Sequence, residues 1–352
     1  VVDGFAGGGL YVDGSHGSPL IFIDELAKTT NEINAKREIS GMRPISVEAL
    51  LLLNDADPAV IGQLKLAVNE FSKNVQDNST CLSLAIEYSS DKFEVLYPNV
   101  VTRINAAKCR NVIFNLDQCG YSAVTAYAIS DIVSRWRSAE IFLTFAIETL
   151  LAFLSRNKSN LSLAFDAELK ARIETLSRNS EQLLTTQDWL GQAERIVFSH
   201  FRQCAPYVSP FSINNPDGWR YWLMHFANSH RARQVYNDIL HSDNAVQAHF
   251  GRPGLNMLSY DPRNEGQIYL FDDDSRDRAK GALINEVPTL IAESGDAMSM
   301  GYFYATAYRA TPAHTDDIHE VMIANPDIEV ITEAGGARRQ PGTIRPSDTL
   351  KL

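Results

Sequence analysis

The first residues of this sequence have the types and spacing of a ligand-binding turn. Two β-branched residues and Asp3 run directly into Gly7, Gly8 and Gly9. Glycine allows φ > 0 and lets backbone N–H groups approach a ligand without a Cβ in the way, while Asp3 can accept hydrogen bonds or hold a cationic group. A glycine turn after a strand is equally typical of a plain structural turn, so this motif needs support from elsewhere in the chain.

Carboxylates follow two further apolar runs of the sequence. The run 49–53 ends near Asp55 and Asp57, and the run 111–116 ends at Asp117. Parallel strands bind ligands at their carboxyl ends, so these groups are expected at one edge of a sheet together with Asp3. Asp57 precedes Pro58 and is explained as a helix cap, which leaves Asp55 as the expected ligand of a ribose.

This set fits methyl transfer from S-adenosylmethionine, in which the turn accommodates the methionine part and the loop after the fourth strand faces the acceptor atom. A dinucleotide site is disfavoured because the G-x-G-x-x-G fingerprint with an acidic residue about 20 positions later is absent. A thiolate nucleophile at Cys119 is disfavoured because Pro does not precede it. A nuclease is a distant alternative, since no cluster of carboxylates with a nearby Lys stands out.

The elements that must position these groups are predicted from local patterns. Ser18 is the expected N-cap of a helix that begins at Pro19, and 29–44 is predicted to be a loop or frayed helix. Pro58 begins a second helix with an apolar stripe. Two successive strand–turn–helix units predict an α/β fold with a Rossmann-like parallel sheet. Further strands are predicted at 93–96, 111–116 and 139–145.

The rest of the chain is predicted to hold a helical insertion and a second domain. The insertion covers about 155–205, a strand follows at 219–228, and the charged run 272–278 marks a boundary between domains at 1–270 and 275–352. The second domain has the pattern of a winged helix, with three helices and then a two-stranded ribbon with a basic tip. Arg338, Arg339 and Arg345 are the expected phosphate contacts, although acidic neighbours make a protein-binding surface equally consistent.

Composition narrows the functional classes. The chain has 352 residues and a formal charge of -11, which argues against a protein coated in nucleic acid but allows a local basic groove. Its four cysteines form no CxxC pair, so neither a metal site nor a disulfide framework is predicted. The longest apolar run, 141–154, is too short and too polar to span a bilayer. A cytoplasmic setting fits these features.

Three segments together resemble the three-Cys-motif partner (TcmP) proteins, which are related to the class I methyltransferases near the branch that methylates adenine N6 of 23S ribosomal RNA. These segments are 2–9, 17–20 and 221–231. The resemblance implies a fold that binds S-adenosylmethionine, a winged-helix-like tail, and association with phage defence or mobile elements beside a radical-SAM-like three-Cys-motif protein. DNA or RNA is then a candidate partner. The implied cofactor contacts are Asp3, Phe5, Gly7, Gly9, Ser18 and Asp55, and the implied acceptor-binding residues are Asp117 and Tyr121.

The sequence also departs from this family. Gly8 stands where the family has Pro, and the loop after the fourth strand reads Asp117-Gln118-Cys119-Gly120-Tyr121 where the amino-methylating relatives have Asp-Pro-Pro and an aromatic residue. Fixing an acceptor amine at attack distance depends on that rigidity. Two hypotheses follow: a methyltransferase acting on nucleic acid, with adenine N6 as a candidate target, or a catalytically inactive module that assembles a defence complex.

Overall fold

A computed structural model describes residues 1–79, 81–156, 167–180, 186–214, 220–242, 247–250, 268–269 and 273–352. The chain divides into two compact units. Unit 1 comprises residues 1–125 and 136–145, and unit 2 comprises residues 126–135 and 146–352. The domain boundary expected at 270–275 includes residues 270–272, which lie outside the described residues. This boundary stays a prediction.

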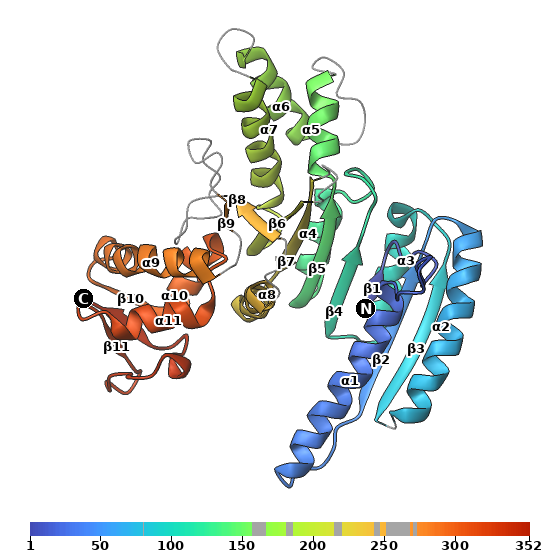
Figure 1. The fold of residues 1–352 in the computed structure, drawn as a ribbon, viewed down its shortest axis with the longest axis horizontal. Helices are drawn as coiled ribbons and strands as arrows, with labels where there is room; N and C mark the ends of the chain where they lie inside the picture. Colours follow the sequence, from blue (N-terminus) through green and yellow to red (C-terminus); the bar gives the residue numbers. More distant parts are fainter. Residues whose placement is uncertain are drawn as a thin grey trace. The chain divides into compact units, whose positions relative to one another are not determined.

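Unit 1 is a parallel α/β sheet in the strand order β3-β2-β1-β4-β5 (Figure 1). The short strand β1 lies between β2 and β4, where Val2 pairs with Leu52 on one side and Phe114 on the other. The strand order therefore reverses at β1, which confirms the predicted Rossmann-like class and makes the end of β1 the topological switch point. The strands of unit 1 are β1 (Val2–Asp3), β2 (Val47–Asn54), β3 (Leu82–Ser89), β4 (Asn111–Leu116) and β5 (Ser138–Phe145).

Three helices of unit 1 connect these strands: α1 (Ser18–Ile39), α2 (Pro58–Asn78) and α3 (Phe93–Ala106). Helix α1 continues through most of the segment predicted as a loop. The strand predicted at 93–96 is wrong, because those residues begin α3 and the third strand is β3. Phe93 and Leu96 are buried three positions apart while Val95 is exposed, and this helical spacing cannot be told from strand alternation within the four residues 93–96 alone.

Unit 2 contains helices and an antiparallel sheet. Strand β6 (Tyr207–Asn214) pairs antiparallel with β7 (Arg220–Ala227) over the whole length of both strands. Trp222 and Phe226 of β7 are buried core residues. Ser229 caps the helix that follows β7, since its Oγ accepts the N–H of Ala232. The other elements of this part are α4 (Ala126–Arg135), α5 (Ile147–Arg156), α6 (Ala167–Ser180), α7 (Thr186–Phe201), α8 (His230–Ser242), β8 (Gln247–Phe250) and β9 (Ile268–Tyr269).

The C-terminal part of unit 2 has winged-helix architecture. Its sheet has the order β10-β12-β11, so the two-stranded ribbon predicted from sequence is in fact three-stranded. Strand β10 has three residues and begins directly before a helix, which leaves it without a recognisable alternating pattern. The elements are α9 (Asp273–Glu293), β10 (Ala297–Ser299), α10 (Met300–Ala305), α11 (Thr315–Ala324), β11 (Glu329–Ile331) and β12 (Thr349–Lys351), with short 3₁₀ turns at η2 (Ala307–Ala310) and η3 (Pro341–Thr343).

One hydrophobic cluster holds the C-terminal elements together. Its buried side chains come from every helix and strand of the winged helix and also include Tyr207 of β6 and Ala227 of β7. Tyr207 adds a hydrogen bond of 3.0 Å from its hydroxyl to the carbonyl of Tyr304. The winged helix thus shares its core with the antiparallel strands of unit 2. Among the described helices, none is both long and apolar enough to cross a membrane.

Candidate cofactor site at the end of β1

The glycine turn leaves the sheet at the switch point with the backbone that its sequence predicts. Gly7 has φ of 61° and Gly9 has φ of 84°, a region that L-residues other than glycine seldom adopt. A Cβ built on Gly7 would meet no atom within 4 Å, whereas one on Gly4 would lie 2.9 Å from Leu116 and from Phe93. The base of the turn is thus tightly packed while its far side, at Gly7, is open.

Asp3 is fully buried beneath this turn. Its carboxylate accepts a hydrogen bond of 2.6 Å from the hydroxyl of Ser18 and one of 3.4 Å from the N–H of Phe5. Burial raises the pKa of Asp3 to about 6, against the hydrogen bonds from Ser18, Asn115 and Phe5, and the charge of Asp117 raises it further. In the described part of the chain no cationic side chain pairs with Asp3. The turn therefore rests on a carboxyl group whose charge is only partly offset.

Ser18 has a different role from the one predicted. The N-cap of α1 is Gly17, which makes no side-chain cap, and Ser18 is the first helical residue. Its hydroxyl instead joins α1 to the carboxylate of Asp3. Gly17 also donates its N–H to the carbonyl of Gly9 at 2.8 Å, and a Cβ there would lie 3.1 Å from that oxygen. The start of α1 is therefore locked against the end of the glycine turn.

Asp55 also holds the turn. One of its carboxylate oxygens accepts the N–H of Gly7 at 3.2 Å, and the other accepts the N–H of Asp57 at 2.9 Å. Asp57 caps α2 through the N–H of Ala59, as the sequence predicted. Asp55 remains partly exposed, so contact with a ribose stays a prediction alongside its observed role in fixing Gly7.

Asn54, the last residue of β2, was missed by sequence reasoning. Its amide donates to the carbonyls of Gly4 and Asp91 at 3.0 and 2.9 Å, and its side-chain oxygen accepts the hydroxyl of Ser89 and the N–H of Asp91. Its own carbonyl accepts the N–H of Ala6 at 2.7 Å. One buried amide thus ties the end of β2 to the loop that follows β1 and to the loop that follows β3. The only sequence signal was a polar residue at the end of an otherwise apolar strand.

Phe5 lies at the edge of the turn. It is half-buried, and its ring centroid is 5.9 Å from that of Phe93 at the start of α3. Phe5 therefore lies beside the open part of the turn and packs on the buried ring of Phe93. A direct contact between Phe5 and a cofactor stays a prediction.

The loop after β4 contains the predicted acceptor-binding residues. Asp117 is exposed, and Tyr121 is half-buried with its ring centroid 6.4 Å from that of Phe145. Between them Gln118 turns into the protein, where its side-chain oxygen accepts the N–H groups of Ala123 and Val124 at 2.9 and 3.1 Å. Cys119 is exposed and free. A buried glutamine, which sequence reasoning missed, thus holds this loop through two backbone N–H groups.

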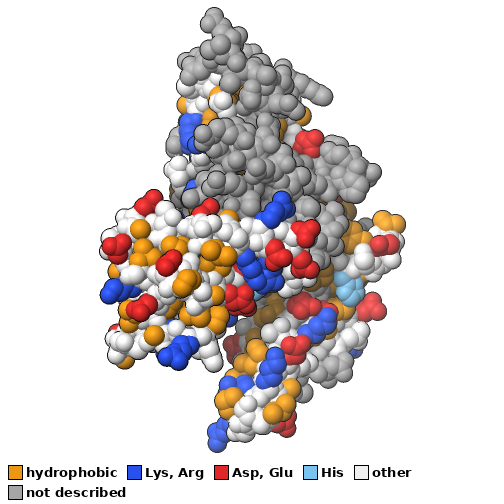
Figure 2. All heavy atoms as spheres, turned by 60° about the vertical axis from the view of Figure 1, so that its left-hand side comes forward, with side chains coloured by type: hydrophobic (Ala, Val, Ile, Leu, Met, Phe, Trp, Pro, Cys, Tyr) orange, Lys and Arg blue, Asp and Glu red, His pale blue; other side chains and the backbone are white. Residues whose placement is uncertain are grey.

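The three basic residues predicted at the tip of the wing have different surroundings. Arg338 forms a two-pronged ion pair with the buried Asp348 at 2.9 and 3.2 Å. Arg345 lies close by and gives its backbone N–H to the same carboxylate. The side chains of Arg339 and Arg345 are exposed. Figure 2 shows acidic and basic side chains interspersed over the face that carries the C-terminal elements. Phosphate contacts at these arginines stay a prediction.

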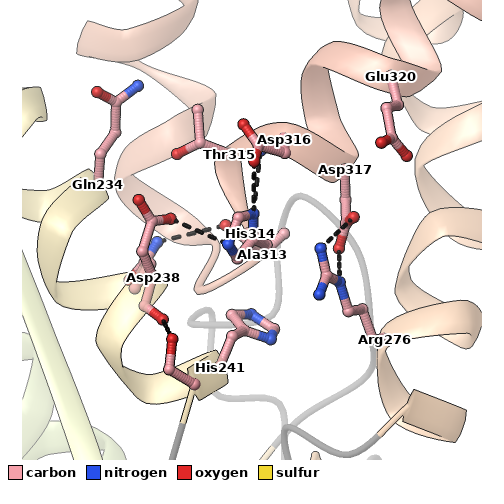
Figure 3. Close-up of polar contacts among 12 residues, drawn as sticks. Gln234, Asp238, His241, Arg276, Ala313, His314, Thr315, Asp316, Asp317 and Glu320 are labelled. Carbon is pink, nitrogen blue, oxygen red and sulfur yellow. Dashed lines mark hydrogen bonds and ion pairs between the residues drawn. The ribbon is translucent and has the colours of Figure 1, made fainter. Parts of the chain in front are cut away.

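A polar cluster joins α8 to the winged helix (Figure 3). His314 caps α11 by accepting the N–H of Asp316 at its Nδ1 atom, and its Nε2 atom lies 3.4 Å from the carboxylate of Asp238 in α8. His241, also in α8, lies 3.1 Å from the carbonyl of Pro312. Burial lowers the pKa of His241 to about 4, so its ring is neutral at physiological pH. In the described residues no group of three His, Cys, Asp or Glu side chains could hold a metal ion.

Comparison with known proteins gives one match. Residues 259–335 match the family model of the GMT-like wHTH domain, in agreement with the winged helix seen in the structure. No curated protein and no solved structure matches the chain. The comparisons therefore support a C-terminal winged helix-turn-helix domain, joined to a chain whose first unit has a Rossmann-like fold.

Proposed function

We propose that this protein is an S-adenosylmethionine-dependent methyltransferase acting on nucleic acid. The observation that carries the proposal is the glycine turn at the switch point, open at Gly7 and resting on the buried carboxyl of Asp3. Ligands of open α/β sheets bind at this place, and a cationic ligand suits a buried carboxylate that has no cationic partner among the described residues. Winged helices commonly bind nucleic acid, so the C-terminal domain is compatible with such a substrate.

The chain's own residues suggest how the site would work. S-adenosylmethionine supplies a methyl group on a positively charged sulfur when it is bound. Asp3 and Asp55 hold the turn in shape through Ser18 and Gly7, and Phe5 stands beside the turn. Asp117 would accept a hydrogen bond from an acceptor amine, for which adenine N6 is a candidate, and Tyr121 would stack on the base. A setting in phage defence beside a three-Cys-motif partner is proposed from the family resemblance.

Calorimetric titration of the protein with S-adenosylmethionine tests the site. Gly7→Val is the diagnostic variant and Gly41→Val is its matched control, because both residues have positive φ, at 61° and 68°, and a Cβ added at either would meet no atom within 4 Å. Both should lose similar stability, roughly 1–3 kcal/mol. Only Gly7→Val should lose binding. Absence of binding in the folded parent, or equal binding by Gly7→Val and the parent, would overturn the proposal.

One observation favours a second candidate, a methyltransferase-fold module without catalysis. The residue after Asp117 is engaged in holding its own loop, since Gln118 is buried and bonded to Ala123 and Val124. Transfer of a labelled methyl group to DNA or RNA separates the candidates. A methyltransferase should lose transfer in Asp117→Asn while keeping cofactor binding. If the parent and this variant both bind the cofactor and neither labels nucleic acid, the second candidate is supported.

A further inference from the structure

A basic pocket in unit 2 lies outside both the glycine turn and the tip of the wing. Its volume is about 670 Å3, and its lining comes from the end of α7, the segment leading into β6, and the region from α10 to η2. Arg202 and Arg309 are its charged lining residues, and Ser199, Gln203 and Thr306 add polar groups. The described residues that line it include no carboxylate, in a protein whose formal charge is -11.

The two arginines lie near each other, and the described residues provide no counter-ion for them. The guanidinium of Arg309 is oriented by hydrogen bonds to the carbonyls of Pro206 and Ala305, and it lies 6.0 Å from the ring centre of Tyr207. These contacts use its Nε and Nη1 atoms and leave Nη2 for another partner. In the described part of the chain neither arginine forms an ion pair. The Arg202 side chain reaches solvent, but its partial burial, followed by the charge of Arg309, lowers its pKa below the usual range.

Local structure explains the position of each arginine taken singly, but it does not explain why two arginines share one pocket. Arg202 directly follows the C-terminus of α7, where a cation is favourable, and Arg309 packs on Tyr207. Neither effect requires two guanidinium groups in the same pocket, and their mutual repulsion is unfavourable until an anion lies between them. The planar forks of two arginines match the oxygen atoms of a phosphate group.

We propose that the pocket containing Arg202 and Arg309 binds a phosphate group. The pocket is large enough for more than a single ion, so the phosphate can belong to a nucleic-acid backbone or to a free phosphorylated molecule. If the backbone is the source, the pocket extends the nucleic-acid surface beyond the winged helix, and in that respect the inference rests on the proposed function. Phosphate binding itself does not depend on methyl transfer.

Arg202→Gln tests the proposal without disturbing the fold, because the Arg202 side chain is exposed and makes no hydrogen bond among the described residues. Arg195→Gln is the matched control, since Arg195 is also exposed and lies in α7. Gln203→Glu is a second test, because it places a carboxylate in the pocket. The probes are inorganic pyrophosphate, followed by calorimetry, and short single- and double-stranded oligonucleotides of unrelated sequence, followed by fluorescence anisotropy.

The outcomes separate the two sources of phosphate. If the source is a backbone, Arg202→Gln weakens all oligonucleotides about equally, by roughly 5- to 10-fold, and reduces the slope of log affinity against log salt by about 1. If the source is a free molecule, the variant loses pyrophosphate binding and leaves oligonucleotide binding unchanged. Gln203→Glu should lose binding of the same probes as Arg202→Gln, and Arg195→Gln should bind every probe as the parent does. Equal behaviour of Arg202→Gln, Arg195→Gln and the parent with every probe would overturn the proposal.

Titration of the same variants with S-adenosylmethionine keeps this test separate from the proposed function. Arg202→Gln should bind the cofactor as the parent does, because Arg202 belongs to unit 2 and the glycine turn to unit 1. Loss of phosphate binding with cofactor binding intact supports the pocket alone. A parent that binds phosphate at this pocket but no S-adenosylmethionine would support the pocket and overturn the methyltransferase proposal.

Discussion

Two buried carboxylates, one in each unit, have opposite electrostatic surroundings. Burial opposes the ionisation of both. At Asp317 it is more than offset by Arg276 and Lys280, whose nitrogen atoms lie 2.8 and 3.0 Å from one carboxylate oxygen, and the pKa of Asp317 falls below its usual value. At Asp3 the partners are a hydroxyl and amide groups, and the pKa rises to about 6. The carboxylate of the winged helix is neutralised by two cations, whereas that of the glycine turn has only neutral hydrogen-bond donors among the described residues.

The largest effect is expected when the neutralised carboxylate is removed. Asp317→Asn should lower the free energy of unfolding by roughly 2–4 kcal/mol, because it leaves Arg276 and Lys280 without their shared partner. The lower part of this range is expected because both cations are one-third exposed. Urea denaturation at pH 7 measures the change. Asp316→Asn is the control, since the Asp316 side chain is 67% exposed. Similar losses in both variants would remove the distinction between Asp317 and an ordinary surface carboxylate.

At the glycine turn, replacing the buried carboxylate should increase stability instead of lowering it. Asp3→Asn should raise the free energy of unfolding at pH 8 by about 1–3 kcal/mol, because the buried charge disappears while the amide can still accept the hydroxyl of Ser18. The gain should disappear near pH 4, where the native carboxyl is already protonated. The same variant should bind S-adenosylmethionine more weakly. A variant that is less stable than the parent at pH 8 would contradict the view that Asp3 is electrostatically unfavourable in the absence of a ligand.

A smaller change in stability is expected when Arg338 is replaced, and its neighbour Arg339 serves as the comparison. Arg338→Gln should cost about 1–2 kcal/mol of stability, because Asp348 is buried and loses both of its hydrogen bonds from the guanidinium. Arg339→Gln should leave stability unchanged, because Arg339 is exposed. Thermal denaturation checks stability, and anisotropy with an oligonucleotide checks binding. If Arg338→Gln changes only binding, the pair with Asp348 contributes little to folding.

The last prediction concerns how the free energy of unfolding changes with pH. His241 has a pKa lowered to about 4, so the unfolded chain takes up its proton first, and this residue removes stability as the pH falls below 6.5. Asp3 has a raised pKa, so the native state takes up the proton first, and this residue adds stability as the pH falls through about 6. Urea midpoints between pH 4 and 7 should therefore fall more steeply in Asp3→Asn and less steeply in His241→Gln. Parallel curves for the parent and both variants would refute these opposing contributions.

The sequence predicted the parts of the fold that depend on local pattern. The apolar runs of β2 and β4, the cap at Asp57 and the glycine turn are each specified within a few residues, and the structure confirms them. The helix at Phe93 was mistaken for a strand because its first four residues satisfy both periodicities. The third strand of the winged helix has three residues, too few for either pattern.

The features that were missed depend on residues far apart in the chain. Asn54 contacts the loops that follow two other strands, β1 and β3, and Ser18 reaches Asp3 across 15 positions. Arg202 and Arg309 form one pocket from segments more than 100 positions apart. No local pattern marks such residues, because their partners are selected by the tertiary fold. What could be inferred was the edge of the sheet at which the carboxylates gather.

The order of strands in the winged helix has a consequence for gene truncation and for the choice of fragments to express. Strand β12 lies in the middle of its sheet and pairs with both β10 and β11. The family match ends at residue 335, before β12 begins at Thr349. A stop codon between these positions would leave the recognisable domain complete while removing the strand that joins the other two. Such a product would expose two unpaired strand edges and be prone to aggregation and degradation.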